Sequence, residues 1–171
     1  MPALTYKNLT IRTAEIRDAA QLTAWWNDGA VMAHAGFPNG LGTTVEEVIA
    51  GMGKDRLVLE EGGRLIGEAC CRPAGEKCAE IGIKICEPDC QNRGLGRVFL
   101  SMLIGWLFEA GNETIVLDTD LENRRAQHVY ESLGFRKLRI NRDSWTDQLG
   151  QPRSSVDYEL KRADFVDFRE C

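Results

Sequence analysis

The chain has 171 residues, of which 43% are apolar and 27% are charged, and its formal net charge is −5. This length and composition are typical of one globular domain with its own core, and they exclude a disordered chain. The acidic balance argues against a nucleic-acid partner, because such proteins usually carry a basic surplus or a basic stripe. A cationic or amine partner fits it better.

No segment predicts a membrane span or a secretion signal. No apolar run approaches the roughly 20 residues that cross a bilayer, and no basic stretch followed by an apolar one opens the chain. The six cysteines form no Cys-x-x-Cys pair, and only two histidines accompany them. Because reduced cysteines behave as small apolar residues in strands, we expect a cytoplasmic protein without disulfides or a metal site.

The amino-terminal segment predicts a strand and then a helix. Leu9 and Ile11 alternate with polar residues as in a strand, and apolar residues recur at helical spacing between Asp18 and Asn27-Asp28-Gly29. Trp25 and Trp26 lie about 100° apart on such a helix. We therefore expect one of them to pack inward, while the other either covers the helix edge or lines a groove for an amine substrate.

Residues 30–42 lack periodicity and predict a surface loop of the kind that often shapes a substrate entrance. Thr44 followed by Glu47 predicts the capping box of a second helix. Two alternating segments, Arg56 to Glu60 and Arg64 to Arg72, then predict an antiparallel hairpin around Glu61-Gly62-Gly63.

Cys78 to Cys86 is the predicted central strand, with Glu80, Gly82 and Lys84 on one of its faces. Pro88 has no N–H group and cannot continue a ladder. We therefore expect this strand to part from its neighbour near residues 86–88, which opens a gap between two strands.

A glycine turn, Gln91-Asn92-Arg93-Gly94-Leu95-Gly96, connects this strand to an apolar segment from Arg97 to Glu109. A glycine turn at the start of a helix presents free N–H groups that attract phosphate. A nucleoside-triphosphatase loop would need Lys followed by Ser or Thr where Arg97 and Val98 stand. A dinucleotide fingerprint is a closer rival, but Phe99 replaces its third glycine and the connection before Gly94 is too long.

The segment from Arg97 to Glu109 predicts a helix that is buried nearly all round. Its small or polar residues fall four apart and predict a narrow exposed seam: Arg97, Ser101, Gly105 and Glu109. Thr114 to Asp118 is continuously apolar up to its last residue, which predicts a covered strand parallel to its predecessor. Asn123 is the expected N-cap of a short helix that ends at Gly134.

The remaining sequence predicts two closing strands, Arg136 to Arg142 and Val156 to Arg162, with a turn-rich excursion from Trp145 to Pro152. Ala163 to Cys171 would add a last helix. Without repeats or linkers, residues 1–171 are expected to form one domain.

Two segments carry a family resemblance. The spacing Gln91-x-x-Gly94-x-Gly96 is similar to the pyrophosphate motif Gln/Arg-x-x-Gly-x-Gly/Ala of the GNAT superfamily of acyl-CoA-dependent N-acyltransferases. The segment from Asn123 to Phe135 resembles the family element Asn-x-x-Ala-x-x-x-Tyr-x-x-x-Gly-Phe. The resemblance extends from Cys78 to Phe135. More loosely, the chain resembles the branch that acetylates ribosomal-protein amino termini, although aminoglycoside and polyamine acetyltransferases share much of the outline.

The resemblance implies a single-domain α/β fold with a mixed, splayed central sheet flanked by helices, and acetyl-CoA as cosubstrate. It places the pyrophosphate on the backbone of the glycine turn, with Arg93 or Arg97 as charge partners. The turn residues implied in cofactor binding are Gln91, Asn92, Arg93, Gly94, Leu95 and Gly96. The pantetheine arm would lie in the strand gap against the backbone of Ile83, Ile85 and Cys86, and against Asn123.

The same resemblance implies direct transfer of acetyl to a primary amine, without a cysteine nucleophile. Tyr130 is the expected general acid for the departing thiolate, and it also contacts the cofactor. Glu80 is the first candidate for the base, with Asp118 and Asp120 as alternatives. The acceptor is expected to be a protein amino terminus or a small amine. A non-catalytic acyl-CoA sensor is the alternative, and the protein is expected to be a monomer or a homodimer.

Overall fold

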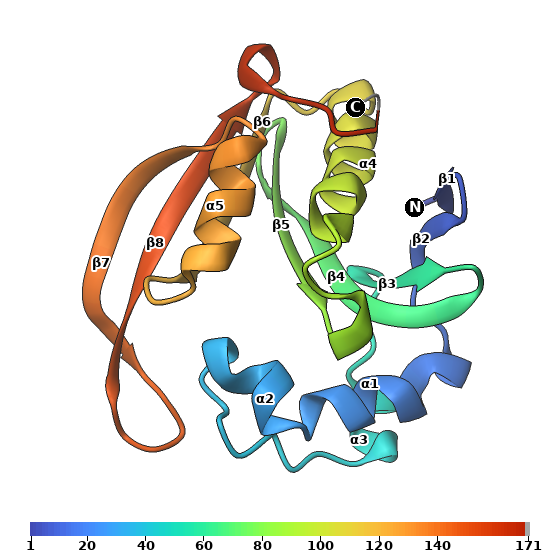
Figure 1. Cartoon of the computed structure of the whole chain (residues 1–171), viewed down its shortest axis with the longest axis vertical. Coiled ribbons are helices and arrows are strands. Elements are labelled where there is room, and N and C mark those ends of the chain that lie inside the picture. Colours follow the sequence, from blue (N-terminus) through green and yellow to red (C-terminus); the bar gives the residue numbers. More distant parts are fainter. Residues whose placement is uncertain (170–171) are drawn as a thin grey trace.

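An eight-stranded sheet organises the protein, in the order β1-β2-β3-β4-β5-β6-β8-β7 (Figure 1). The computed structural model describes residues 1–169. Every pair of neighbouring strands is antiparallel except β5 and β6, which are parallel. The predicted mixed sheet is therefore confirmed. The strands are β1 (Leu4–Tyr6), β2 (Leu9–Thr13), β3 (Arg56–Glu61), β4 (Arg64–Gly75), β5 (Cys78–Ile85), β6 (Thr114–Asp120), β7 (Arg136–Thr146) and β8 (Pro152–Lys161).

Helices cover both faces of this sheet. They are α1 (Ala19–Trp26), α2 (Gly29–Met32), α3 (Val45–Ala50), α4 (Leu95–Glu109) and α5 (Arg124–Ser132). On strand β3, Leu57 and Leu59 join the core under α4, whereas Val58 joins the smaller cluster under α1 and α3. This alternation shows that α4 and α1 lie on opposite faces. None of the helices within residues 1–169 is long and apolar enough to cross a bilayer.

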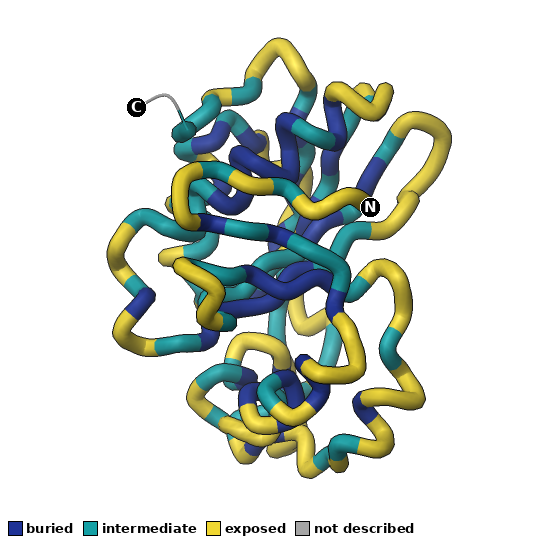
Figure 2. Tube along the Cα trace, turned by 90° about the vertical axis from the view of Figure 1, so that its right-hand side faces the viewer, coloured by how far each residue is buried: buried dark blue, intermediate teal, exposed yellow. Residues whose placement is uncertain are grey.

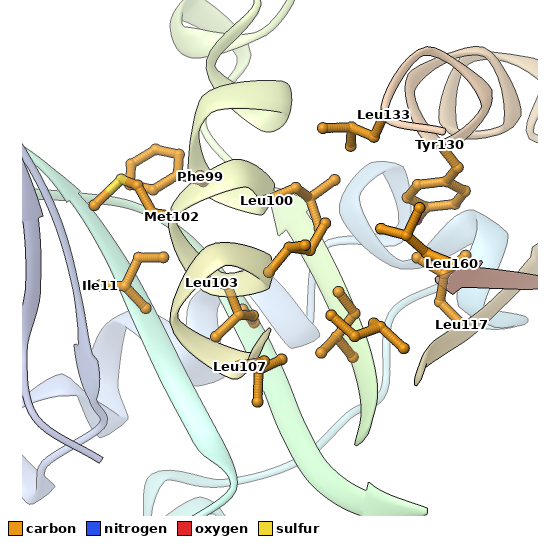
Figure 3. Packing of buried hydrophobic residues seen from close by; sticks show 14 of the residues in the cluster. Ile11, Phe99, Leu100, Met102, Leu103, Leu107, Leu117, Tyr130, Leu133 and Leu160 are labelled. Atoms are coloured by element: carbon orange, nitrogen blue, oxygen red, sulfur yellow. The ribbon is translucent and has the colours of Figure 1, made fainter. Parts of the chain in front are cut away.

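Helix α4 is the centre of the larger core (Figure 3). Its side chains Phe99, Leu100, Leu103 and Ile104 are at most 1% exposed, which confirms the predicted burial on nearly every side. Along the trace in Figure 2, buried residues concentrate on the central strands and helix, and exposed residues lie mainly on the outer loops and turns. Close packing of the helix from Phe99 to Phe108 thus also holds its first turn in place.

The predicted exposed seam on α4 is wrong at Ser101 and Gly105, because the carboxyl-terminal segment covers them, whereas Glu109 is exposed as predicted. The backbone N–H of Phe168 donates to Ser101 Oγ at 2.9 Å, and the Arg97 guanidinium lies 4.9 Å from the centre of the Phe168 ring. A side chain on Gly105 would collide with Arg169, at 2.7 Å from its Cβ. Small residues along the seam therefore make room for a strap of chain rather than for solvent.

Several element boundaries also differ from the predictions. Strand β1 was not predicted, residues 29–35 form α2 and a 3₁₀ turn that overlap the start of the predicted loop, and β7 extends to Thr146, two residues into the predicted excursion. After a 3₁₀ turn at Arg162–Asp164, no further helix forms up to residue 169; Cys171 lies outside the described residues. The capping box of Thr44 with Glu47 and the N-cap Asn123 are both confirmed.

Strands β5 and β6 pair over only three residues and then diverge. Their ladder runs from Cys78 opposite Thr114 to Glu80 opposite Val116, whereas β6 continues to pair with β8 as far as Asp120. The prediction placed the parting near residues 86–88, about five residues after the position where the strands part in the structure. Pro88 lies beyond the divergence and is not its cause; each strand instead follows its antiparallel partner, β4 or β8.

Replacement of Leu103 by alanine tests the central place of α4. The side chain is 1% exposed, so Leu103→Ala should lower the free energy of unfolding by about 2–5 kcal/mol in urea denaturation. Leu138→Ala is the matched control, because Leu138 is 57% exposed on β7; it should change stability by less than about 0.5 kcal/mol. Equal losses for both variants would contradict the packing described.

Candidate active site

The glycine turn forms an open cradle of backbone N–H groups. Asn92 and Gly94 adopt left-handed conformations, with φ of 59° and 76°, and these turn the chain into α4. Within residues 1–169, the N–H groups of residues 92–96 donate no hydrogen bond, and no side chain caps the helix. A Cβ on Gly96 would meet no atom within 4 Å. Several donors at the positive end of a fifteen-residue helix suit a diphosphate.

Two arginines lie near this cradle, and they differ in whether the charge is already in an ion pair. Arg93 makes a bidentate pair with Glu61, both contacts at 2.8 Å, so its charge is already used. Arg97 lies near the turn, its Nη2 3.9 Å from the Cβ position of Gly94, and makes no ion pair within the described residues. Of the two predicted charge partners, the geometry favours Arg97.

Gln91 fastens the turn to the end of the central strand. Its Nε2 donates to the carbonyl of Ile85 at 3.0 Å, and its Oε1 accepts from Arg125 at 3.4 Å. The side chain of Gln91 therefore positions the cradle, while the later residues of the turn supply its free N–H groups.

A cleft of about 440 Å³ lies where β5 and β6 diverge. The gap is visible in Figure 1 between β5 and the strands β6 and β8, with α5 beside it. Residues from distant parts of the sequence, between Val31 and Ser155, meet here. The lining consists of Val31, His34, Ala35, Gly82, Ile83, Lys84, Asp118, Thr119, Asp120, Asn123, Ala126, Tyr130, Trp145 and Ser155.

Tyr130 is 6% exposed, and its ring packs against Phe135 and Tyr158 with centroids 5.9 and 5.8 Å away. Its hydroxyl has no hydrogen-bond partner among residues 1–169. The hydroxyl is not among the fully buried polar atoms, and the residue lines the cleft. Burial, with a smaller effect of the Asp118 carboxylate, raises the pKa of Tyr130 above its ordinary value. A phenol in this setting keeps its proton at neutral pH and can donate it.

Two of the candidate carboxylates occupy different places. Asp118 lines the cleft; solvent reaches it, but the surrounding protein and then the carboxylates of Asp157 and Glu80 raise its pKa. Glu80 lies outside the cleft lining and pairs with Arg72 through contacts of 2.6 and 3.1 Å. This geometry does not favour Glu80, the first candidate for the base. Its carboxylate is paired with Arg72, and its backbone lies in the part of β5 that still pairs with β6.

Asp120 lines the cleft but is already neutralised. Its buried carboxylate pairs with Arg153, and His34 Nδ1 lies 3.7 Å away. The guanidinium of Arg153 also lies over the ring of Trp145, 5.9 Å from its centre. Asp120 therefore anchors the β7–β8 hairpin over the cleft, and it is less available than Asp118 to accept a proton.

Gln148 joins the tip of the β7–β8 hairpin to the loop after α2, next to the cleft-lining residues His34, Ala35 and Trp145. Its N–H donates to the carbonyl of Gly36 at 2.8 Å, its Nε2 donates to Gly40 at 2.9 Å, and its Oε1 accepts from Asn39 at 3.0 Å. Trp145 packs so tightly on Gly36 that a Cβ there would lie 2.4 Å from its ring. The sequence analysis missed this clamp, because no local motif marks contacts across 108 residues.

Three further residues that the sequence analysis singled out make their contacts outside the cleft lining. Trp25 is buried and donates to Glu87 at 2.7 Å, while Trp26 donates to Glu68 at 3.0 Å; neither lines the cleft, so the predicted tryptophan wall is not found there. Cys86 is 2% exposed and its N–H donates to Ile66, which removes that donor from the strand gap.

Known proteins are similar to this chain in sequence and in fold. The family model described as Acetyltransferase (GNAT) family matches residues 5–135. A mycothiol acetyltransferase of Thermomonospora curvata is 29% identical over 148 residues, which are 82% of this chain and 49% of that protein. A ribosomal protein bS18-alanine N-acetyltransferase of Escherichia coli K12 is 33% identical over 85 residues, which are 50% of this chain and 57% of that protein.

Among solved structures, spermidine N-acetyltransferase from Vibrio cholerae, in complex with CoA and spermine, has a TM-score of 0.81 at 21% identity. The match covers 92% of this chain and 97% of that one. The chain therefore has the N-acetyltransferase fold. It belongs to the GNAT acetyltransferase family, whose model matches well over half of its residues. The chain spans only about half the length of the two curated relatives named above.

Gly96→Val tests the cradle, because a Cβ at this position meets no protein atom within 4 Å and the added side chain would occupy the open space beside the free N–H groups. We expect acetyl-CoA binding measured by calorimetry to weaken at least tenfold, while the urea midpoint stays unchanged. Gly96 is a cleaner site than Gly94, whose φ of 76° makes any side chain strained. Unchanged affinity would show that the diphosphate does not bind here.

Proposed function

We propose that this protein is an acetyl-CoA-dependent N-acetyltransferase that transfers acetyl directly to a primary amine. The observation that carries the proposal is the connection between two features. The free N–H groups of residues 92–96 stand at one end of the unpaired β5 edge, and a cleft that contains Tyr130 and Asp118 lies along that edge.

The unpaired edge of β5 suits an extended, amide-containing arm such as pantetheine. Beyond Glu80, this edge has no strand partner on the β6 side, so backbone groups near Ile83 remain for a ligand that takes the place of a strand. The Ile85 carbonyl is already used by Gln91. Asn123 lines the cleft while its Oδ1 accepts from the N–H of Ala126 at 3.1 Å. It therefore caps α5, and its amide N–H₂ remains available to the arm.

The proposed chemistry assigns one residue to each proton transfer. The acceptor arrives as an ammonium ion and loses a proton to Asp118, directly or through water. Its nitrogen then attacks the thioester carbonyl, a C–N bond forms and the C–S bond breaks. Tyr130 gives its proton to the departing thiolate, and the second proton, which the nitrogen loses as the amide forms, returns to the Tyr130 phenolate directly or through water. The products are the acetylated amine and coenzyme A.

For the acceptor, we propose a protein α-amine first and a small-molecule amine second. The bS18-alanine N-acetyltransferases among the relatives support the first, and the mycothiol and spermidine enzymes support the second. The clamp between Gln148 and residues 36–40 joins two segments next to the cleft lining, and we expect it to favour an amine at the end of an extended chain over one on a bulky ring system.

Tyr130→Phe tests the general acid. It should lower kcat by about 10²–10⁴-fold, the usual contribution of general acid–base catalysis, and leave the dissociation constant of acetyl-CoA nearly unchanged. Tyr158→Phe is the matched control, because that tyrosine packs edge-on against Tyr130 but its hydroxyl donates to Glu131 at 2.9 Å. Thiol release with Tyr130→Phe at the wild-type rate would remove Tyr130 as the acid. Tight acetyl-CoA binding with no amine-dependent thiol release in the wild type would instead indicate a sensor.

Asp118→Asn and Glu80→Gln separate the two candidate bases. A base acts only when deprotonated, so kcat/KM should rise as pH passes the raised pKa of Asp118, above the ordinary value of about 3.9. Asp118→Asn should abolish that limb of the profile and lower kcat. Glu80→Gln should keep kcat and move the limb to lower pH, because Glu80 contributes to the raised pKa. The reverse outcome would restore Glu80 as the base.

A further inference from the structure

Lys84 brings a positive charge into the cleft that the proposed reaction does not use. It stands on β5 between Ile83 and Ile85 and belongs to the cleft lining. Because β5 has no β6 partner at this position, the Lys84 side chain lies on the wall where the acceptor would approach.

The ammonium group of Lys84 is only loosely satisfied by the protein. Its Nζ lies 3.5 Å from Glu68 Oε1 and 3.2 Å from the thioether sulfur of Met32. The first distance is long for a charged hydrogen bond, and thioether sulfur is a weak acceptor. Since an ammonium group has three N–H donors, Lys84 keeps donors for a ligand.

Glu68 does not need Lys84 as its counter-charge. This carboxylate is 5% exposed, and it accepts from Arg56 at 3.0 Å on one oxygen and from Trp26 at 3.0 Å on the other. Arg56 also lies over the Trp26 ring, 4.9 Å from its centre. The group of Glu68, Arg56 and Lys84 thus carries one positive charge beyond neutrality, and Lys84 is its member in the cleft.

The opposite wall of the cleft carries the complementary charge. Asp118 stands on β6 and makes no ion pair within residues 1–169, whereas Asp120 beside it is neutralised by Arg153. One unneutralised carboxylate and one loosely held ammonium therefore face a single cleft from two diverging strands. A ligand with both an amine and an anion matches this arrangement.

We propose that the acceptor carries a carboxylate close to its reactive amine, and that Lys84 binds this carboxylate while Asp118 receives the proton from the amine. This inference rests on the proposed acetyl transfer and narrows its substrate class. Two sources have this chemistry: a free amino acid, and a peptide amino terminus with an acidic side chain in its first residues. Lys84 is then a specificity-determining residue.

Matched acceptor pairs test the inference without any variant. Thiol release from acetyl-CoA is measured with amino acids and their amides, and with short peptides in which a second-position Glu is replaced by Gln. The acidic member of at least one pair should give the higher kcat/KM, and the pair that shows the difference identifies the source. Equal values within every pair would overturn the inference while leaving acetyl transfer intact. Absence of thiol release with every amine would overturn the proposed function and this inference together.

Lys84→Met then assigns the effect to this residue. For the preferred acidic acceptor, KM should rise about 10- to 100-fold, as expected for the loss of one charge-assisted hydrogen bond. The neutral partner and the dissociation constant of acetyl-CoA should be unaffected, and Lys84→Arg should retain the preference. Lys77→Met is the control, because Lys77 is exposed and pairs with Glu113 at 2.6 Å outside the cleft. An equal loss for acidic and neutral acceptors would show that Lys84 has only a structural role.

Discussion

The divergence of β5 from β6 is the constraint on which the rest of the site depends. Only three residue pairs hold these parallel strands together, after which each follows its own antiparallel neighbour. A sheet that remained paired would leave neither a free backbone edge nor a cleft. The unpaired groups are tolerated because the gap is open to solvent, where water satisfies them until a ligand does.

Helix α4 stabilises the fold beside this opening and fixes the position of the glycine turn. It buries nearly all of its surface in the larger core, and the strap formed by residues 165–169 covers its remaining face. A helix so firmly packed holds its first turn in one place, and Gln91 ties that turn to Ile85 at the end of β5. The phosphate cradle and the strand gap are therefore fixed relative to each other before any cofactor arrives.

Local signals in the sequence predicted the part of the protein that local signals determine. The periodicity of residues 97–109, the cap at Asn123 and the run from Thr114 gave the crossover from β5 through α4 to β6, and the structure confirms it. The parting of the strands was placed too late, because Pro88 was the only visible break and the pairing of β6 with β8 leaves no mark in the sequence of β6. The seam on α4 was misinterpreted for a similar reason: a segment more than 60 residues away covers it.

The clamp at Gln148 has a consequence for how the two halves of the site can vary. The cradle, the central strand and Tyr130 all come from one contiguous stretch, residues 78–135. The clamp instead joins Gln148 to residues that lie 108 and 109 positions away in the sequence. Exchange of the two clamp segments as a matched pair would therefore alter the proposed acceptor side of the cleft and leave the cradle and the strand gap unchanged.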